Sequence, residues 1–294
     1  MSDERSALVT SLSSLITLMK RILTAIVALP ILLYTVWSEN PYFFVALTSI
    51  AILIALNEFY NLASKAGCRA FAINGYVAAL LIIACFVLDG VAWIVAVIAA
   101  ATLISLAHAL ARPDELSKSL VSVSATIFGV IYVALLAGYL IGVRMTDDAL
   151  TQTPTPHLAS KLLTMFFAMV MMTDTGAYYT GRSIGRRKLA PRISPGKTIE
   201  GSVGGFIAAI ITGPLCRLIF FSEIPVMHAA ALGAVIGIVG QVGDLAESML
   251  KRGSDVKDSG TLLPGHGGML DRVDSLLFCA PLLYYYSRVF IAKL

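Results

Sequence analysis

The stretch 248–274 holds the residues best suited to chemistry, because cations and carboxylates alternate along it. The cations are Lys251, Arg252, Lys257 and Arg272, and the carboxylates are Asp255, Asp258, Asp271 and Asp274. Carboxylates bind hard cations such as Mg2+, and neighbouring Lys and Arg side chains can hold the phosphates that such a metal bridges. The glycines Gly265, Gly267 and Gly268 allow the backbone to approach a ligand closely. The pattern therefore predicts a site for a metal and phosphate groups.

Three aspartates of this region are expected to converge. Asp271 and Asp274 are three residues apart at the start of the last apolar segment, so both can point from one face of its first helical turn. Asp244 lies near the end of the preceding apolar segment. We expect these carboxylates to form a cluster that can hold a metal and a nucleotide. In a structural alternative the two acids only cap the helix and balance Arg272, but this does not explain the glycines or His266.

A second cationic loop, GRSIGRRKLAPRISPGKTIEG, follows the sixth apolar segment. Within it, Ser194 is the expected helix N-cap and Pro195 the first helical residue. Free backbone N–H groups at that helix start, together with Lys197 and Thr198, can bind a phosphate. The cations at 186–188 are explained equally well by membrane topology, by contact with lipid headgroups or by catalysis.

The composition indicates that membrane helices hold these residues. Of 294 residues, 57% are hydrophobic and 14% are charged, and the mean hydropathy is +0.83. A helix needs about 20 apolar residues to cross a hydrocarbon core about 30 Å thick. Nine apolar segments approach this length, at residues 22–37, 42–57, 72–88, 91–111, 120–143, 160–180, 202–221, 227–250 and 275–292. Because lipid cannot satisfy an open backbone, the predicted fold class is all-α, a polytopic integral membrane protein with about nine transmembrane helices.

Two of these segments carry charged groups near one end, which is unusual because charges inside a bilayer are costly. The sixth segment contains Asp174. Four polar residues of the eighth segment are spaced by three, three and four residues and so share one helix face: Gln241, Asp244, Glu247 and Lys251. Such charges favour a functional site. A structural ion pair is the alternative, above all for Glu247, which can pair with Arg252 or Lys251.

The distribution of Lys and Arg predicts the orientation of the chain. With nine spans, 17 of the 22 Lys and Arg residues fall on one side of the membrane. The five on the other side are Arg144, Lys161, Arg217, Arg288 and Lys293. The side with 17 is expected to be cytoplasmic, which places the N-terminus and the loops 181–200 and 251–274 there. The net charge of +4 reflects this asymmetry and does not indicate nucleic-acid binding.

The two halves of the chain differ in their charged groups. Residues 1–150 carry almost no charge within their apolar segments and no motif that indicates chemistry, so they are predicted to be a transmembrane scaffold. Residues 151–294 hold the groups described above and are predicted to be the catalytic part, with the two cytoplasmic loops. The four cysteines are scattered, so neither a zinc site nor a disulfide framework is predicted.

The stretch 248–274 resembles the signature of the phosphatidate cytidylyltransferases, also called CDP-diglyceride synthases. The matching positions are Ser248, Lys251, Arg252, Lys257, Asp258, Gly260, Leu263, His266, Gly267, Gly268, Asp271, Arg272 and Asp274. So many fixed positions over 27 residues make the match specific. The sequences DTGAYYTGR and PRISPGKTIEG also look like this family, so the resemblance is firm from about residue 170 to the end.

The resemblance implies an enzyme of the bacterial cytoplasmic (inner) membrane that transfers a cytidylyl group from CTP to phosphatidic acid, forming CDP-diacylglycerol and pyrophosphate. It implies a homodimer and a dependence on Mg2+, with Asp244 and Asp271 as metal ligands and room for a second, monovalent ion. The residues implied to bind substrate are Ser194, Lys197, Thr198, Arg252, Lys257, Asp258, Arg272 and Asp174. The residues implied to be catalytic are Asp244, Lys251, His266, Asp271 and Asp274.

For such an enzyme we expect the phosphatidate phosphate, already an anion near neutral pH, to attack the α-phosphorus of CTP in line, with pyrophosphate as the leaving group. No covalent enzyme intermediate is needed. Catalysis then consists of positioning two phosphates and neutralising their charge. Three roles stay open for His266: donating to a phosphate oxygen, protonating the leaving pyrophosphate or stabilising its turn.

Other functions share some of these features. An ion-coupled transporter or lipid flippase also has charges within its spans, but it places them near the midplane, whereas here they gather at one face and in one half. A sister enzyme that activates another lipid phosphate, or a kinase that uses CTP, would differ in the headgroup it accepts. The CDP-alcohol phosphotransferases are excluded because their D-G-x-x-A-R motif is missing, since Asp89-Gly90 is followed by Val-Ala-Trp.

Overall fold

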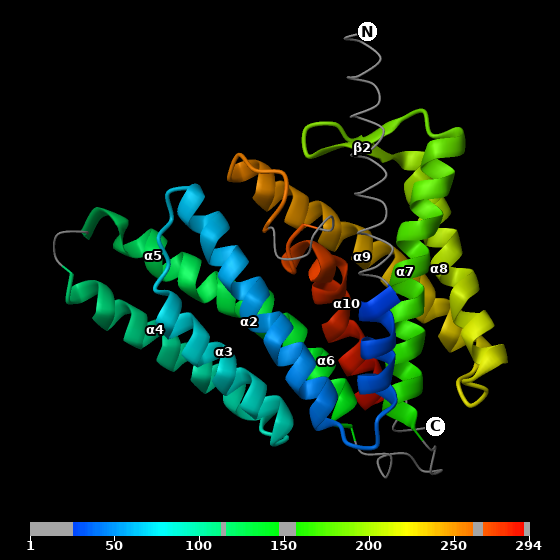
Figure 1. The fold of residues 1–294 in the computed structure, drawn as a ribbon, viewed down its shortest axis with the longest axis horizontal. Helices are drawn as coiled ribbons and strands as arrows, with labels where there is room; N and C mark the ends of the chain where they lie inside the picture. Colours follow the sequence, from blue (N-terminus) through cyan, green and yellow to red (C-terminus); the bar gives the residue numbers. More distant parts are fainter. Residues whose placement is uncertain (1–25, 113–115, 147–156, 261–266, 291–294) are drawn as a thin grey trace, which may run out of the picture.

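Helices form nearly all of the structure, a computed structural model that describes residues 26–112, 116–146, 157–260 and 267–290 (Figure 1). In chain order the helices are Ile26–Trp37, α2 (Tyr42–Lys65), α3 (Ala72–Val87), α4 (Ile94–Leu110), α5 (Leu116–Gly129), α6 (Leu136–Arg144), α7 (Leu158–Ile184), α8 (Ile199–Ile219), α9 (Val226–Gly253) and α10 (Leu270–Val289). A π-helical segment, Val130–Leu135, joins α5 to α6 into one continuous helix. A helix therefore lies at each of the predicted apolar segments.

Six helices in the described part of the chain are long and apolar enough to cross a membrane, which is typical of a multi-pass membrane protein. They are Tyr42–Lys65, Val91–Leu110, Ser117–Arg144, Leu158–Ile184, Ile199–Ile219 and Val226–Gly253. The apolar helices Ile26–Trp37 and Ala72–Val87 are shorter. α10 has 20 residues, but charged residues occupy its first two turns: Asp271, Arg272 and Asp274. The count of nine spans therefore stays a prediction.

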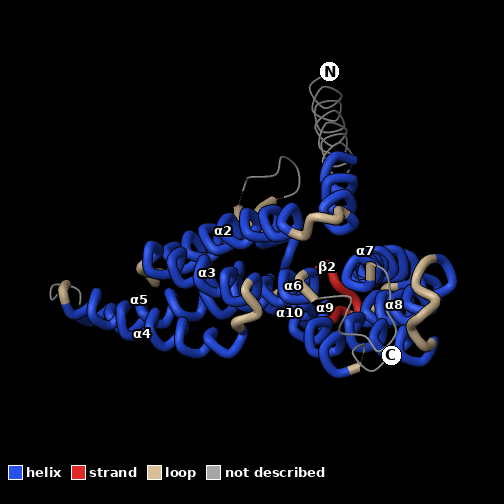
Figure 2. Tube along the Cα trace, turned by 90° about the horizontal axis from the view of Figure 1, so that it is seen from below, coloured by secondary structure: helices blue, strands red, loops and turns tan. Residues whose placement is uncertain are grey.

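α10 lies between two groups of helices (Figures 1 and 2). One group contains α2 to α6, and the other contains α7, α8 and α9. α10 contributes to two hydrophobic cores, since Cys279 and Leu283 pack in the core around α7, while Leu270 and Leu277 pack in the core around α2 and α3. The charged start of α10 is thereby held between the two groups.

α7 and α8 approach each other closely because α8 carries glycines on the face toward α7. A Cβ at Gly205 would lie 2.6 Å from the carbonyl oxygen of Thr173, and one at Gly201 would lie 2.7 Å from that of Ala177. Small residues allow such backbone contact between membrane helices. The close packing fixes α7, which carries Asp174, against the helix that follows the second cationic loop.

That cationic loop forms a short β-hairpin, which departs from the all-α prediction. Its antiparallel strands are β1 (Lys188–Ala190) and β2 (Ser194–Thr198). The carboxylate of Glu200 accepts hydrogen bonds from the backbone N–H groups of Arg186 and Arg187, at 3.0 and 3.2 Å. The hairpin is therefore tied to the first turn of α8.

The prediction that Ser194 caps this helix is wrong. Ser194 begins β2, and α8 begins at Ile199 and not at Pro195. Thr198 is the N-cap, because its backbone is extended and its Oγ1 accepts a hydrogen bond from Gly201 N at 3.1 Å. Pairing with β1 keeps the SPGKT stretch extended, so the chain turns into a helix only after it.

Candidate active site

On the polar face of α9, Gln241 and Asp244 contact two different neighbouring elements. Gln241 donates its side-chain amide to the carbonyl oxygen of Ser202 at 3.1 Å, which ties α9 to α8. Asp244 forms an ion pair with Lys197 of β2, with 2.5 Å between Oδ2 and Nζ. The side chains of this pair are 32% and 28% exposed, so a ligand can reach both.

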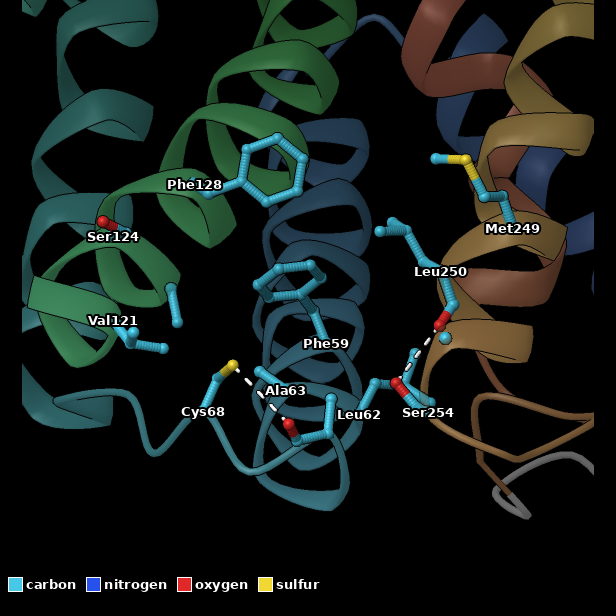
Figure 3. A pocket seen from close by; sticks show the side chains of 13 residues that line it. Phe59, Leu62, Ala63, Cys68, Val121, Ser124, Phe128, Met249, Leu250 and Ser254 are labelled. Carbon is cyan, nitrogen blue, oxygen red and sulfur yellow. Dashed lines mark hydrogen bonds between the residues drawn. The ribbon is translucent and has the colours of Figure 1, made fainter. Parts of the chain in front are cut away.

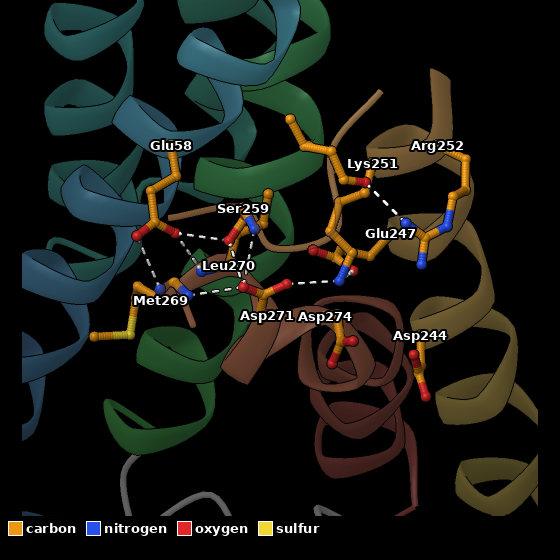
Figure 4. A network of polar contacts seen from close by, with 12 residues as sticks. Glu58, Asp244, Glu247, Lys251, Arg252, Ser259, Met269, Leu270, Asp271 and Asp274 are labelled. Atoms are coloured by element: carbon orange, nitrogen blue, oxygen red, sulfur yellow. Dashed lines mark hydrogen bonds and ion pairs between the residues drawn. The ribbon is translucent and has the colours of Figure 1, made fainter. Parts of the chain in front are cut away.

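Lys251 lies between two carboxylates at the end of α9 (Figure 4). Its Nζ is 2.5 Å from Oε2 of Glu247 and 2.6 Å from Oδ1 of Asp271. Glu247 is fully buried, and neither of its oxygens accepts a well-directed hydrogen bond from the described residues. The charge of Lys251 is therefore what offsets the cost of burying this carboxylate. The pairing of Glu247 with Lys251, one of the two partners expected for it, is confirmed.

Asp271, in the first turn of α10, uses both of its oxygens. Oδ1 pairs with Lys251. Oδ2 accepts hydrogen bonds from Ser259 N at 3.0 Å, Ser259 Oγ at 2.9 Å and Gly268 N at 2.7 Å. Asp271 thus ties the end of α9 and the residues that follow it to the residues that precede α10.

Glu58 of α2 completes this network and was not among the predicted site residues. Its Oε1 accepts a hydrogen bond from Met269 N at 3.0 Å, and its Oε2 accepts one from Leu270 N at 2.8 Å. Ser259 Oγ lies 3.1 Å from the same Oε2. Glu58 is buried in a helix that is otherwise largely apolar, in the half of the chain predicted to be scaffold. An isolated carboxylate in an apolar helix was the signal that could have identified it.

A second group of charges gathers where α7, α9 and α10 meet. Asp174, Asp244 and Asp274 lie close enough for their charges to act on one another. Lys197 acts on Asp174 and Asp274, and Arg272 acts on Asp174. Figure 4 shows Asp244 and Asp274 outside the network that connects Glu58 to Lys251. This group offers negative oxygens to a cation and positive groups to phosphates.

The expected metal ligands Asp244 and Asp271 belong to different networks. The oxygens of Asp244 fit a hard divalent cation, because its partner Lys197 is partly exposed and can be exchanged. Asp271 fits less well in this arrangement, since Lys251 and three hydrogen bonds already engage its oxygens. Among the described residues, no three His, Cys, Asp or Glu side chains are close enough together to hold a metal ion. His266 lies outside the residues that the structure describes.

The other cations expected to bind substrate lie around the end of α9. Arg252 donates Nε to the carbonyl oxygen of Ile193 at 3.2 Å, so it links the turn of the hairpin to α9. Lys257 and Asp258 are exposed in the segment after α9, and Arg272 is exposed on α10. Arg252 therefore contacts the hairpin, and all four side chains are exposed enough for a substrate to reach them.

An apolar pocket of about 490 Å³ lies between α2, α5 and the end of α9 (Figure 3). Its walls include Phe59, Leu62, Phe128, Met249 and Leu250, and none of its lining residues is charged. A triphosphate would find no counter-charge there, so we exclude this pocket as the nucleotide site.

The chain matches a sequence model described as the cytidylyltransferase family over residues 19–290. It is similar to a phosphatidate cytidylyltransferase of Bacillus subtilis, with 42% identity over 162 residues, which are 54% of this chain and 56% of that protein.

Two other relatives named phosphatidate cytidylyltransferase are similar over a shorter length. The protein of Brucella melitensis is 48% identical over 128 residues, 44% of this chain and 47% of its own length. The protein of Staphylococcus saprophyticus is 51% identical over 118 residues, 40% of this chain and 45% of its own length. The chain thus spans about half the length of the curated relatives it matches.

Proposed function

The chain belongs to the cytidylyltransferase family, and on that premise we propose that it transfers a cytidylyl group from CTP to phosphatidic acid, forming CDP-diacylglycerol and pyrophosphate. The names of its relatives support this choice of substrates. The observation that carries the proposal is the partly exposed ion pair of Lys197 with Asp244, near enough to Asp174 and Asp274 for their charges to act on one another. Such a mixed set suits a reaction between two phosphates, which repel each other unless their charge is neutralised.

In the proposed reaction, an oxygen of the phosphatidate phosphate attacks the α-phosphorus of CTP. The bond from that phosphorus to the bridging oxygen of the β-phosphate breaks, and pyrophosphate leaves with the electron pair. We assign the binding of phosphate oxygens to Lys197 and Arg272, and we assign Lys257 to the same role at the outer edge of this site. The protein acts by holding the two reactants in line and by lowering their repulsion.

Lys197 and Asp244 are proposed to separate when substrate binds. They neutralise each other across 2.5 Å in this structure. A triphosphate competes with Asp244 for Lys197, because both are anions that accept hydrogen bonds from an ammonium group. Asp244 then has a free carboxylate for a divalent cation. This exchange would couple binding of the nucleotide to binding of the metal.

Mg2+ is the proposed cofactor, with Asp244 and Asp271 as its protein ligands, and a second, monovalent ion is part of the proposal. A bound Mg2+ supplies positive charge that polarises and holds phosphate oxygens. Asp244 fits this role once Lys197 has left it. Asp271 would first have to release Lys251 before it could bind the metal. The other carboxylates near Asp244 are Asp174 and Asp274.

Removal of divalent cations tests the proposal. Purified protein in detergent with EDTA is expected to release no pyrophosphate from CTP and phosphatidate, because the cationic side chains alone do not offset the charge of the triphosphate. An excess of Mg2+ should restore release, whereas an equal ionic strength of NaCl should not. The measurement is a coupled pyrophosphate assay with omission of each substrate in turn. Full release in EDTA would contradict the metal assignment, and no release under any condition would contradict the function.

We further propose a homodimer with nine spans, a cytoplasmic N-terminus and a site that faces the cytoplasm of a bacterial inner membrane. Contacts of the cations assigned to the outer side support this topology. Lys161 pairs with Glu223 at 2.5 Å, and Arg288 pairs with Asp89 at 2.9 Å. Each pair joins two segments that the proposed topology places on the same side.

A further inference from the structure

Glu58 caps α10 from a position 211 residues away in the sequence. The first backbone N–H groups of any helix lack partners within that helix. The residue before α10, Met269, provides no side-chain cap. Glu58 supplies it instead by accepting hydrogen bonds from Met269 N and Leu270 N. A carboxylate at this end of a helix is also favoured by the helix dipole.

Two glycines leave room for this carboxylate. A Cβ at Gly260 would collide with Oε1 of Glu58, and a Cβ at Gly268 would collide with Glu58 Oε2 and with Ser259 Oγ. Both glycines belong to the charged stretch 248–274. The residues just after α9 and those just before α10 therefore close around one buried side chain of α2.

The same contacts tie Glu58 to Asp271. Three consecutive N–H groups before and at the start of α10 are divided between the two carboxylates, with Gly268 N bound to Asp271 and the next two bound to Glu58. Ser259 Oγ lies 3.1 Å from Glu58 and 2.9 Å from Asp271, so its single proton serves one of them at a time. A displacement of Glu58 must therefore move the partners of Asp271.

We propose that Glu58 is a positioning residue for the transfer reaction. It fixes the start of α10, and through Ser259 and Gly268 it sets the orientation of Asp271 toward Lys251. The proposal rests on the proposed function, because Asp271 and Lys251 are assigned to that site. It gives the N-terminal helices a part in catalysis that their composition does not indicate.

A purely structural role would have different consequences. Loss of a buried carboxylate with several hydrogen bonds lowers stability in either case. Only a positioning role also lowers the turnover of each molecule that remains folded. It also predicts that the start of α10 loosens before any substrate is present.

Glu58→Gln is the first test, because it keeps the shape and removes the charge and one acceptor. The amide nitrogen of Gln cannot accept a hydrogen bond from Met269 N or Leu270 N. We expect kcat per folded molecule to fall about 10- to 100-fold, as when a group that orients a charged ligand is lost. The KM for CTP should change by less than about 3-fold, because no contact with CTP is removed. Amide hydrogen exchange in the peptide that covers the start of α10 should become faster without substrates.

Two further variants separate positioning from folding. Ser259→Ala leaves the hydrogen bonds from Met269 N and Leu270 N to Glu58 in place but removes the hydroxyl between Glu58 and Asp271, so kcat should fall while the thermal midpoint drops less than in Glu58→Gln. Glu58→Asp restores the charge and should recover part of the kcat lost in Glu58→Gln. Glu223→Gln makes the same chemical change at the ion pair with Lys161 and should leave both kcat and exchange unchanged.

An unaltered kcat per folded molecule in both Glu58→Gln and Ser259→Ala would overturn the proposal. If Glu58→Gln does not fold, the kcat of Ser259→Ala decides. If the unaltered protein releases no pyrophosphate, the proposed function fails. Amide hydrogen exchange at the start of α10 then tests separately whether Glu58 holds this segment. Equal exchange rates in the unaltered protein and in Glu58→Gln would refute that role of Glu58.

Discussion

Asp244→Asn is expected to lower kcat/KM for CTP by roughly 100- to 1,000-fold, the scale seen when a preorganised electrostatic group is removed from an active site. The substitution keeps the shape of the side chain but removes its charge. Asp244 pairs with Lys197 and interacts with Asp174 and Asp274, so this charge belongs to the group on which the proposed reaction depends. Lys197→Met should produce a loss of similar size, because it removes the other partner.

The loss is measured as pyrophosphate release from purified variants in mixed micelles, with the folded fraction determined by gel filtration. Asp89→Asn is the matched control, since it removes an aspartate charge from the pair with Arg288 on the proposed outer side. Asp89 also has a positive φ of 51°, which Asn tolerates well. Turnover of Asp244→Asn within a few-fold of the unaltered protein would contradict the role of this carboxylate.

Lys251→Met is expected to destabilise the protein by about 3–5 kcal/mol and to abolish activity, because it leaves two carboxylates without their cation. Glu247 is fully buried and the side chain of Asp271 is 7% exposed, so water cannot replace Lys251 well at either one. The double variant Glu247→Gln/Lys251→Met should recover part of the stability, since it removes one unpaired charge. It should recover no activity, because Asp271 still lacks Lys251.

Thermal unfolding in detergent and pyrophosphate release measure the two effects separately. Lys161→Met provides the control, because its partner Glu223 is 36% exposed and water can solvate the remaining charge. That variant should lose less than about 1 kcal/mol and keep its activity. Equal stability losses in Lys251→Met and Lys161→Met would show that burial of the Lys251 network is not what makes it important.

The positions of the helices could be predicted from the sequence because long apolar runs have few alternatives in a membrane protein. All predicted segments coincide with helices in the described residues. The start of α8 was placed wrongly because Ser194 and Thr198 both favour helix caps. Pairing between β1 and β2 decides between them, and that pairing depends on contacts that local sequence does not encode.

The charges of the candidate site were also predictable in part, because each carboxylate in an apolar segment is conspicuous. Asp244 and Asp274, two of the three aspartates expected to converge, lie close enough for their charges to interact, and Asp174, which was not expected in this cluster, lies near them. The partners of Asp271 were not predictable, since spacing along α10 does not reveal that Oδ1 meets Lys251 and that Oδ2 meets backbone donors.

The role of Glu58 was not predictable either, because its partners are far from it in the sequence. Its partners lie in the segment that follows α9 and at the start of α10, and only the packing of α2 against these segments brings them together. The glycines at 260 and 268 were interpreted as part of a ligand-binding loop. Their positions also follow from steric contact with Glu58 and Ser259.

The fate of the phosphates of CTP tests the central claim most directly. The protein is incubated with phosphatidate, Mg2+ and CTP labelled either at the α-phosphate or at the γ-phosphate, and the lipid is then extracted. Our account predicts that the α-label enters the lipid and that the γ-label appears only in pyrophosphate, in equal amounts. Recovery of the γ-label in the lipid, or of neither label, would contradict cytidylyl transfer.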